Sequence, residues 1–211
     1  MSVYIFDFDG TLGDSMGSFA NKMLEILRDH KVDFSEDIIK IITPLGYKGT
    51  AKYFIQEFGL PYTADELIAK MHEVLYPVYR DEIVLKPAVA DYLKKKKNEG
   101  HSLNVLTASP FRVVEPVLKR GRVFDLFDHI WSCEDFNMTK DNPQIYYEAA
   151  ARAGGKPEDV IFFDDNVEAI RTAVSAGIYT IGVYDDASLD YLEEIRKIAN
   201  RFIYRFDEME W

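Results

Sequence analysis

Short apolar runs recur along the 211-residue chain, and each of them ends in polar or acidic residues. The runs are rich in Val, Ile, Phe and Tyr and are nearly continuous, which is typical of strands buried on both faces of a parallel sheet. The pattern predicts strands at Val3–Phe8, Leu103–Thr107, His129–Ser132, Val160–Phe163 and Tyr179–Val183, with a further short strand at Phe202–Tyr204.

Helix-like segments separate the later strands. They are expected at Ala88–Asn98, Phe111–Lys119, Pro143–Ala153, Val167–Ala176 and Leu189–Ile198. Gly100, Gly154 and Gly177 stand just past three of these segments, where a left-handed helix cap is expected. Strand–helix alternation of this kind predicts an α/β fold with a doubly wound parallel sheet, that is, a Rossmann-like core.

The interval between the first strand and Leu103 breaks this alternation, because it holds almost no strand pattern. Its amphipathic periodicity predicts helices at Ser15–His30, Ser35–Ile42, Thr50–Phe58 and Thr63–Tyr79. Four helices cannot form a single βαβ crossover, so we expect a helical bundle inserted after the first strand. The predicted division is a core of residues 1–14 and 86–211 and an inserted domain of residues 15–85.

Composition and charge narrow the choice of partners. The 47% hydrophobic and 29% charged residues are ordinary for a globular protein and exclude a disordered chain. With 25 Lys+Arg against 36 Asp+Glu, the net charge is −11 at pH 7. An acidic surface repels phosphate backbones and anionic lipids, so we expect neither nucleic acid nor a membrane as partner. The sequence leaves the oligomeric state open.

Cysteine and histidine usage excludes several kinds of site. Cys133 is the only cysteine, so neither an intrachain disulfide nor a thiolate metal site is expected. The histidines are scattered, and surface or loop positions are expected for all of them: His30, His72, His101 and His129. The amino terminus lacks a basic region, and no apolar stretch approaches the ~18 residues of a membrane span. We therefore expect a cytoplasmic protein.

Polar side chains follow several of the predicted strands. Asp7-Phe8-Asp9-Gly10-Thr11 ends the first strand, Thr107-Ala108-Ser109 ends the second, and Asp164-Asp165-Asn166 follows the strand at Val160. Lys140 lies in a loop after the strand at His129. Because ligands of open α/β sheets bind outside the carboxyl ends of the strands, these side chains are expected to gather at one edge.

Such a gathering of carboxylates constrains its chemistry. Close carboxylates repel one another, and some would protonate unless a cation compensated them. Oxygen ligands of this kind suit Mg²⁺, which commonly takes one or two carboxylates and a substrate phosphate. One carboxylate can then attack phosphorus while a second acts as acid and base. The pattern favours a Mg²⁺ site that binds a substrate phosphate, and with the acidic net charge a small phosphorylated metabolite is a better candidate for that substrate than a nucleic acid.

The run Asp7-Phe8-Asp9-Gly10-Thr11-Leu12 resembles the first motif, DxDGT, of the haloacid dehalogenase superfamily. Thr107 stands where that family has its second-motif Ser or Thr, Lys140 where it has its third-motif lysine, and Asp164-Asp165 where it has its fourth-motif acidic pair. The inserted bundle is similar to the helical cap of the family. The second aspartate of the first motif, Asp9, is present, which for this family implies phosphate-ester hydrolysis or phosphoryl mutation and not dehalogenation. Nothing in the sequence shows how an aspartyl-phosphate would be protected from water, so we expect a phosphatase.

The resemblance also implies roles for the first-motif residues and the lysine. Asp7 is the expected nucleophile, which forms an aspartyl-phosphate. Asp9 is expected to protonate the leaving oxygen and later to activate water. Thr107 and the amides of Ala108 and Ser109 are expected to bind the phosphoryl group. Lys140 is expected to orient Asp7 and to neutralise charge.

The expected metal ligands are Asp7, Asp9 through its backbone carbonyl, Asp164, and Asp165 directly or through water. Glu168 stands where many relatives carry a further acid. It either contacts the metal ligands without binding the metal itself or lies on an exposed helix face.

The turn-rich segment Thr43–Gly49 is predicted to interrupt the cap helices. In similar proteins such a cap loop faces the catalytic cleft, which would let Lys48 bind the leaving group and Tyr47 pack on it. A plain connecting loop is the alternative. Arg112 adds a contact at the same cleft or is simply a solvated residue at a helix start.

Three other functions stay open at this point. One is a phosphoryl-transferring sugar phosphate mutase of the same family. Another is a signalling module that resembles a response-regulator receiver, which also gathers acids, a hydroxyl residue and a lysine at strand ends. The third is a relative that only binds phosphate.

Overall fold

The protein folds around a parallel β-sheet. The computed structural model describes residues 2–35, 37–42 and 45–209. In the described residues the sheet has six strands in the order β3-β2-β1-β4-β5-β6. They are β1 Val3–Phe6, β2 Ser102–Thr107, β3 His129–Ser132, β4 Val160–Asp164, β5 Tyr179–Val183 and β6 Arg201–Ile203. The predicted doubly wound α/β core is confirmed.

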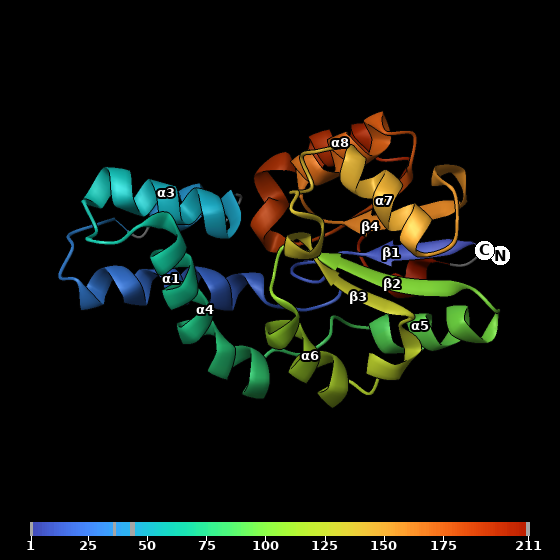
Figure 1. The fold of residues 1–211 in the computed structure, drawn as a ribbon, viewed down its shortest axis with the longest axis horizontal. Helices are drawn as coiled ribbons and strands as arrows, with labels where there is room; N and C mark the ends of the chain where they lie inside the picture. Colours follow the sequence, from blue (N-terminus) through green and yellow to red (C-terminus); the bar gives the residue numbers. More distant parts are fainter. Residues whose placement is uncertain (1, 36, 43–44, 210–211) are drawn as a thin grey trace.

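Helices cover both faces of the sheet. They are α5 Val89–Asn98, α6 Phe111–Arg120, α7 Gln144–Arg152, α8 Val167–Ser175 and α9 Leu192–Ile198. Figure 1 shows α5 and α6 on one face and α7 and α8 on the other. The alternation of side chains along β1 explains both layers: Tyr4 and Phe6 pack in the core with α5 and α6, whereas Ile5 packs with α7.

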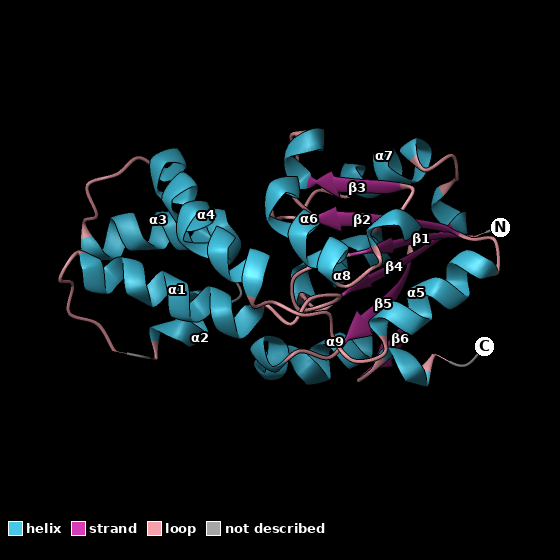
Figure 2. Ribbon diagram, turned by 90° about the horizontal axis from the view of Figure 1, so that it is seen from below, coloured by secondary structure: helices cyan, strands magenta, loops and turns pink. Residues whose placement is uncertain are grey.

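The inserted segment is a helical bundle, as predicted. It consists of α1 Met16–Asp29, α2 Ile38–Ile42, α3 Gly46–Phe58 and α4 Ala64–Asp81. The apolar stripe of α1, which includes Met23 and Leu27, is fully buried. Thr63 and Glu66 form a reciprocal capping box at the start of α4. The bundle lies beside the carboxyl ends of the strands, toward which the strand arrows point in Figure 2.

The segment at the start of α3 differs from the prediction. Thr43 and Pro44 lie outside the described residues, but α3 begins at Gly46, so Tyr47 and Lys48 stand in its first turn and not in a loop. Gly49 lies inside this helix, where a larger residue would clash: a Cβ there would lie 2.7 Å from the Cβ of Leu45. The glycine marks a close contact within the helix start.

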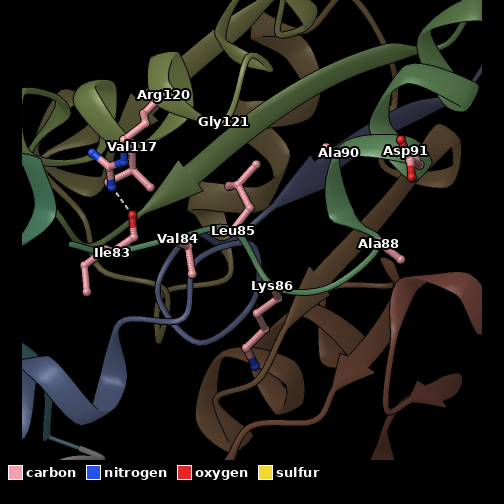
Figure 3. Close-up of a pocket in the computed structure, with 10 residues that line it drawn as sticks. All are labelled: Ile83, Val84, Leu85, Lys86, Ala88, Ala90, Asp91, Val117, Arg120 and Gly121. Atoms are coloured by element: carbon pink, nitrogen blue, oxygen red, sulfur yellow. Dashed lines mark hydrogen bonds between the residues drawn. The ribbon is translucent and has the colours of Figure 1, made fainter. Parts of the chain in front are cut away.

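Two short linkers join the bundle to the sheet, and they run side by side. Gly13 of the first linker bridges Leu85 of the second in antiparallel fashion, and the Lys86 amide donates to the carbonyl of Leu12 at 2.8 Å. Arg120 of α6 donates to the Ile83 carbonyl of the second linker, at the edge of a cavity of about 300 Å³ (Figure 3). No helix in the described part of the chain combines the length and apolar character that crossing a membrane requires.

Candidate active site

Three aspartates meet where β1 and β4 end. Asp7 directly follows β1, Asp164 is the last residue of β4, and Asp165 follows it. A carboxylate oxygen from each lies within 4.8 Å of those of the other two, and all three residues are buried. The two strands are neighbours in the sheet, and the Asp7 amide donates to the carbonyl of Phe163 at 2.8 Å. Strand pairing therefore brings these side chains together, as the sequence predicts.

Lys140 enters this cluster from the loop that precedes α7. Its ammonium group donates to Oδ1 of Asp7 and to Oδ2 of Asp164, the latter at 2.8 Å. The backbone of Lys140 is itself fixed, because the Tyr146 hydroxyl donates to its carbonyl at 2.9 Å. Burial alone would lower the pKa of Lys140, but Asp164 and Asp7 outweigh burial and hold this pKa well above its usual value. Lys140 is therefore a permanent cation between two acids.

The single positive charge of Lys140 does not neutralise the three aspartates. Burial raises the pKa of Asp7 to about 8, with Lys140 opposing the rise and Asp164 and Asp9 adding to it. Burial also raises the pKa of Asp165 well above its usual value, and the charges of Asp164 and Asp185 act in the same direction. The chain alone thus does not keep all three acids ionised. A dense set of carboxylate oxygens with an uncompensated charge suits a hard divalent cation such as Mg²⁺.

The loop after β1 is shaped around Asp165. The Thr11 hydroxyl donates to Oδ1 of Asp165 at 3.0 Å, and the Ser188 hydroxyl donates to Oδ2 at 3.3 Å. Gly10 has a φ of +80°, and a Cβ at this position would lie 2.5 Å from the Asp165 carboxylate. Glycine is therefore required here both for the turn and for the space that the acid occupies.

Asp9 has surroundings of its own. Its carboxylate accepts hydrogen bonds from the Ser15 hydroxyl at 2.7 Å, from the Ser109 hydroxyl at 2.6 Å and from the Tyr79 hydroxyl. Burial raises the pKa of Tyr79 well above its usual value, and Asp9 adds to the rise, so this hydroxyl stays protonated and donates. The side chain of Asp9 is not part of the three-aspartate cluster. The two aspartates of one short motif thus have separate environments.

The segment after β2 lies next to these groups. Thr107 is fully buried, and its hydroxyl oxygen accepts the amide of Ser109 at 3.0 Å. Ala108 is exposed, whereas Ser109 is buried and contacts Asp9. This segment therefore lies beside the acids, as predicted, while its role as a phosphoryl-binding loop stays a prediction.

The two cap residues named in the sequence analysis, Tyr47 and Lys48, differ in how close they lie to the site. The Tyr47 hydroxyl lies 3.2 Å from that of Ser109, so Tyr47 does reach the site. Lys48 is exposed in the first turn of α3. Burial raises the pKa of the Cys133 thiol to about 11, and Lys140 and Lys48 are among the charges that act on it in the opposite direction. Lys48 is thus within electrostatic range of the strand end that carries Cys133.

Glu168 lies on an exposed helix face. Its side chain is 65% exposed and forms an ion pair with Arg171, one turn further along α8. Of the two positions expected for Glu168, the structure thus shows the exposed one, and the side-chain metal ligands Asp7, Asp164 and Asp165 stay a prediction. The backbone carbonyl proposed for Asp9 stays a prediction.

Three residues of this region were not predicted from the sequence, two that contact Asp9 and one that contacts Tyr47. Ser15 occupies the N-cap position of α1 but makes no side-chain capping bond, because its hydroxyl donates to Asp9. Tyr79 belongs to the apolar stripe of α4 and looks like a core residue in the sequence. The surface or loop position predicted for His72 is wrong: it is buried in α4, with its ring centroid 4.6 Å from that of Tyr47.

Comparison with known proteins gives a consistent answer. Residues 4–183 match the family model of the haloacid dehalogenase-like hydrolases. A phosphoglycolate phosphatase of Mannheimia succiniciproducens is 27% identical over 187 residues, which are 84% of this chain and 83% of the relative. Hexitol phosphatase B of Escherichia coli is 26% identical over 183 residues, 85% of this chain and 82% of the relative.

A solved structure has the same fold. The phosphate complex of CbbY from Rhodobacter sphaeroides superposes with a TM-score of 0.85 at 23% identity, covering 99% of this chain and 96% of that chain. The family match spans most of the chain and includes both strands that carry the aspartates. This chain belongs to the haloacid dehalogenase-like hydrolase family.

Proposed function

We propose that this protein is a Mg²⁺-dependent phosphatase that hydrolyses a small phosphorylated metabolite through an aspartyl-phosphate on Asp7. The observation that carries the proposal is that the two aspartates of the first motif have different surroundings, as a nucleophile and an acid–base group require. Asp7 lies buried in a cluster with Lys140, while Asp9, two residues later, is held apart by hydroxyl groups. The phosphatase names of several relatives support the same reaction class.

In the first half-reaction, an Asp7 carboxylate oxygen attacks phosphorus and the bond from phosphorus to the ester oxygen breaks. Lys140 holds Asp7 in place and balances its charge. The carboxyl group of Asp9 gives its proton to the leaving oxygen, so the alcohol departs as a neutral molecule. Thr107 and the amide of Ala108 bind the phosphoryl oxygens, while the Ser109 amide, which donates to the Thr107 hydroxyl, holds that hydroxyl in place.

In the second half-reaction, the Asp9 carboxylate takes a proton from water, and the resulting oxygen attacks phosphorus. The bond from phosphorus to Asp7 breaks, inorganic phosphate leaves, and both aspartates return to their starting states. The hydroxyls of Ser15, Ser109 and Tyr79 fix the orientation of Asp9 for both transfers.

Asp7, Asp164 and Asp165 are the side chains that would hold the cation, with the backbone carbonyl of Asp9 as a further ligand. Bound Mg²⁺ would supply the positive charge that lets these carboxylates and a phosphate dianion coexist. The fit rests on the donor set itself, in which burial raises the pKa values of Asp7 and Asp165 when no divalent charge is near.

Residues 15–85 are the proposed cap domain and residues 1–14 with 86–211 the proposed core. The paired linkers around Gly13 and Leu85 are the natural hinge between them. In this arrangement the cap covers the leaving group, and Lys48 contributes to its binding.

The test is hydrolysis of p-nitrophenyl phosphate and of a panel of metabolite phosphates, with Mg²⁺ and with EDTA. We expect turnover only with the metal, and a loss of several orders of magnitude in the Asp7→Asn variant. Asp14→Asn is the matched control, since Asp14 is an exposed acid of the neighbouring linker. Metal-independent turnover, or an Asp7→Asn variant close to wild type, would contradict the proposal. Phosphate that appears on a second sugar and not in solution would identify a mutase.

A further inference from the structure

His72 is a buried polar residue of the cap that the proposed chemistry does not use. It lies on α4, is 6% exposed, and its Nε2 has no hydrogen-bond partner in the described part of the chain. Buried polar atoms are nearly always paired, because an unpaired one loses its hydrogen bond to water without replacement. An unpaired Nε2 in a cap helix therefore needs a ligand to explain it.

The position of His72 relative to Asp9 is fixed by a short series of contacts. Ser109 donates to Asp9 at 2.6 Å, and its hydroxyl lies 3.2 Å from the Tyr47 hydroxyl. The Tyr47 ring packs edge-on against the His72 ring, with centroids 4.6 Å apart. The leaving oxygen of a substrate must lie within hydrogen-bonding distance of its acid. A leaving group that begins at Asp9 thus extends toward Tyr47 and His72.

Arg112 lies on the core helix that packs against the helix of His72. It stands in the first turn of α6, which packs against α4, and it makes no ion pair or hydrogen bond with any residue that the structure describes. Burial lowers the pKa of His72 to about 4, and the positive charge of Arg112 acts in the same direction. A neutral imidazole and an unpaired guanidinium therefore stand on facing helices.

We propose that His72 and Arg112 bind the leaving group of the substrate, and that this leaving group carries a second anionic group, a carboxylate or a further phosphate. The inference rests on the proposed phosphatase function, because that function places the leaving group beside Asp9.

The chemistry of the pair selects for an anion. A guanidinium binds carboxylate or phosphate oxygens through two parallel N–H bonds, and it cannot lose its charge. An anion between the two side chains satisfies the Nε2 of His72 and favours its protonated form, which adds a second donor. The chain has a net charge of −11, so the positive charge of Arg112, without an acidic partner among the described residues, is a local exception.

The test uses two probes that cannot be hydrolysed. One is 3-phosphonopropionate, which has a phosphonate and a carboxylate, and the other is propylphosphonate, which lacks the carboxylate. Binding of each to the Mg²⁺-loaded full-length protein is measured by calorimetry. We expect the wild type to bind the diacid at least about tenfold more tightly. His72→Leu and Arg112→Gln should each reduce this preference to about twofold or less.

The matched control is His30→Leu. His30 belongs to the same inserted domain, but both of its ring nitrogens have partners, at 2.7 Å from the Ile26 carbonyl and 2.8 Å from the Tyr62 hydroxyl. We expect this variant to keep the preference and to unfold at a lower temperature. His72→Leu should not lower the unfolding temperature, because it removes an unpaired polar atom. Arg112→Gln alters an exposed residue, so its result does not depend on how the protein tolerates the His72 change.

Equal binding of the two probes by the wild type, no binding of either, or a preference that persists in His72→Leu would overturn the inference. Turnover of p-nitrophenyl phosphate is measured in the same preparations and separates the two proposals. Mg²⁺-dependent turnover without a preference for the diacid refutes only the anion site. A preference without any turnover refutes the phosphatase proposal and leaves the binding site standing.

Discussion

Removing the charge of Asp7 should stabilise the metal-free protein at neutral and higher pH. Asp7 is 6% exposed, and burial raises its pKa from 3.8 to about 8. A carboxyl group that holds its proton more tightly in the folded chain than in the unfolded chain contributes stability below its unfolded pKa. That contribution is lost as the pH rises through the folded pKa. In Asp7→Asn this loss cannot occur.

The magnitude follows from the size of the pKa change. Each pKa unit corresponds to about 1.4 kcal/mol, so raising the pKa from 3.8 to about 8 sets an upper limit of about 6 kcal/mol on the loss. For a chain of this size, each kcal/mol moves Tm by about 2–4 °C. In EDTA we expect Asp7→Asn to exceed the wild type by roughly 10 °C at about pH 8, and the two curves to converge near pH 4.

The assay is thermal unfolding followed by circular dichroism at steps between about pH 4 and about pH 8, in EDTA and again in Mg²⁺. The cation should raise the wild-type Tm most at high pH, because it binds the ionised cluster. Occupancy at a hundred times Kd corresponds to about 2.7 kcal/mol. Asp14→Asn serves as the control and should follow the wild type. Parallel curves for the wild type and Asp7→Asn in EDTA would refute the raised pKa of Asp7.

Three further changes have defined outcomes. Gly10→Ala places a Cβ 2.5 Å from the Asp165 carboxylate at a φ of +80°. The free energy of unfolding measured in urea should fall by about 1–3 kcal/mol, and an unchanged value would mean that the loop relaxes without cost. Tyr79→Phe removes a hydrogen bond to Asp9, so kcat should fall about tenfold to a hundredfold with little change in KM. Tyr62→Phe is the control, and an equal fall of kcat in this variant would show a general packing effect. Ala88 has a φ of +66°, so Ala88→Gly should relieve strain and raise stability by up to about 1 kcal/mol in the same urea assay; a lower stability would contradict this reading.

The strands and the acidic cluster were predictable because both follow from local pattern and simple geometry. Strands buried on two faces are continuously apolar. The predicted strands Leu103–Thr107 and Val160–Phe163 therefore lie within one residue of β2 and β4, which are buried along almost their whole length. The carboxyl ends of parallel strands share one edge, which is why Asp7 and Asp164 meet.

The residues around Asp9 were not predictable in this way. Tyr79 and His72 have the periodicity of buried helical positions, and that periodicity does not say which domain a side chain faces. Tyr79 meets Asp9 only through the packing of the helical bundle against the core, and His72 packs on Tyr47 of another helix of the bundle. The start of α3 at Gly46 was not predicted because the glycines of this segment were interpreted as turn residues. Gly49 is instead required by its close approach to Leu45.

The strand order has a consequence for how the chain assembles during synthesis. The central strand β1 is synthesised before both of its neighbours, which begin only at Ser102 and Val160, the residues that pair with Val3. The whole helical insert is made while this apolar strand has no partner. Contacts so distant in sequence form slowly, and an unpaired apolar strand is prone to aggregation. The insert folds through local contacts, so it is able to form first and leave β1 as the exposed element that chaperones would protect.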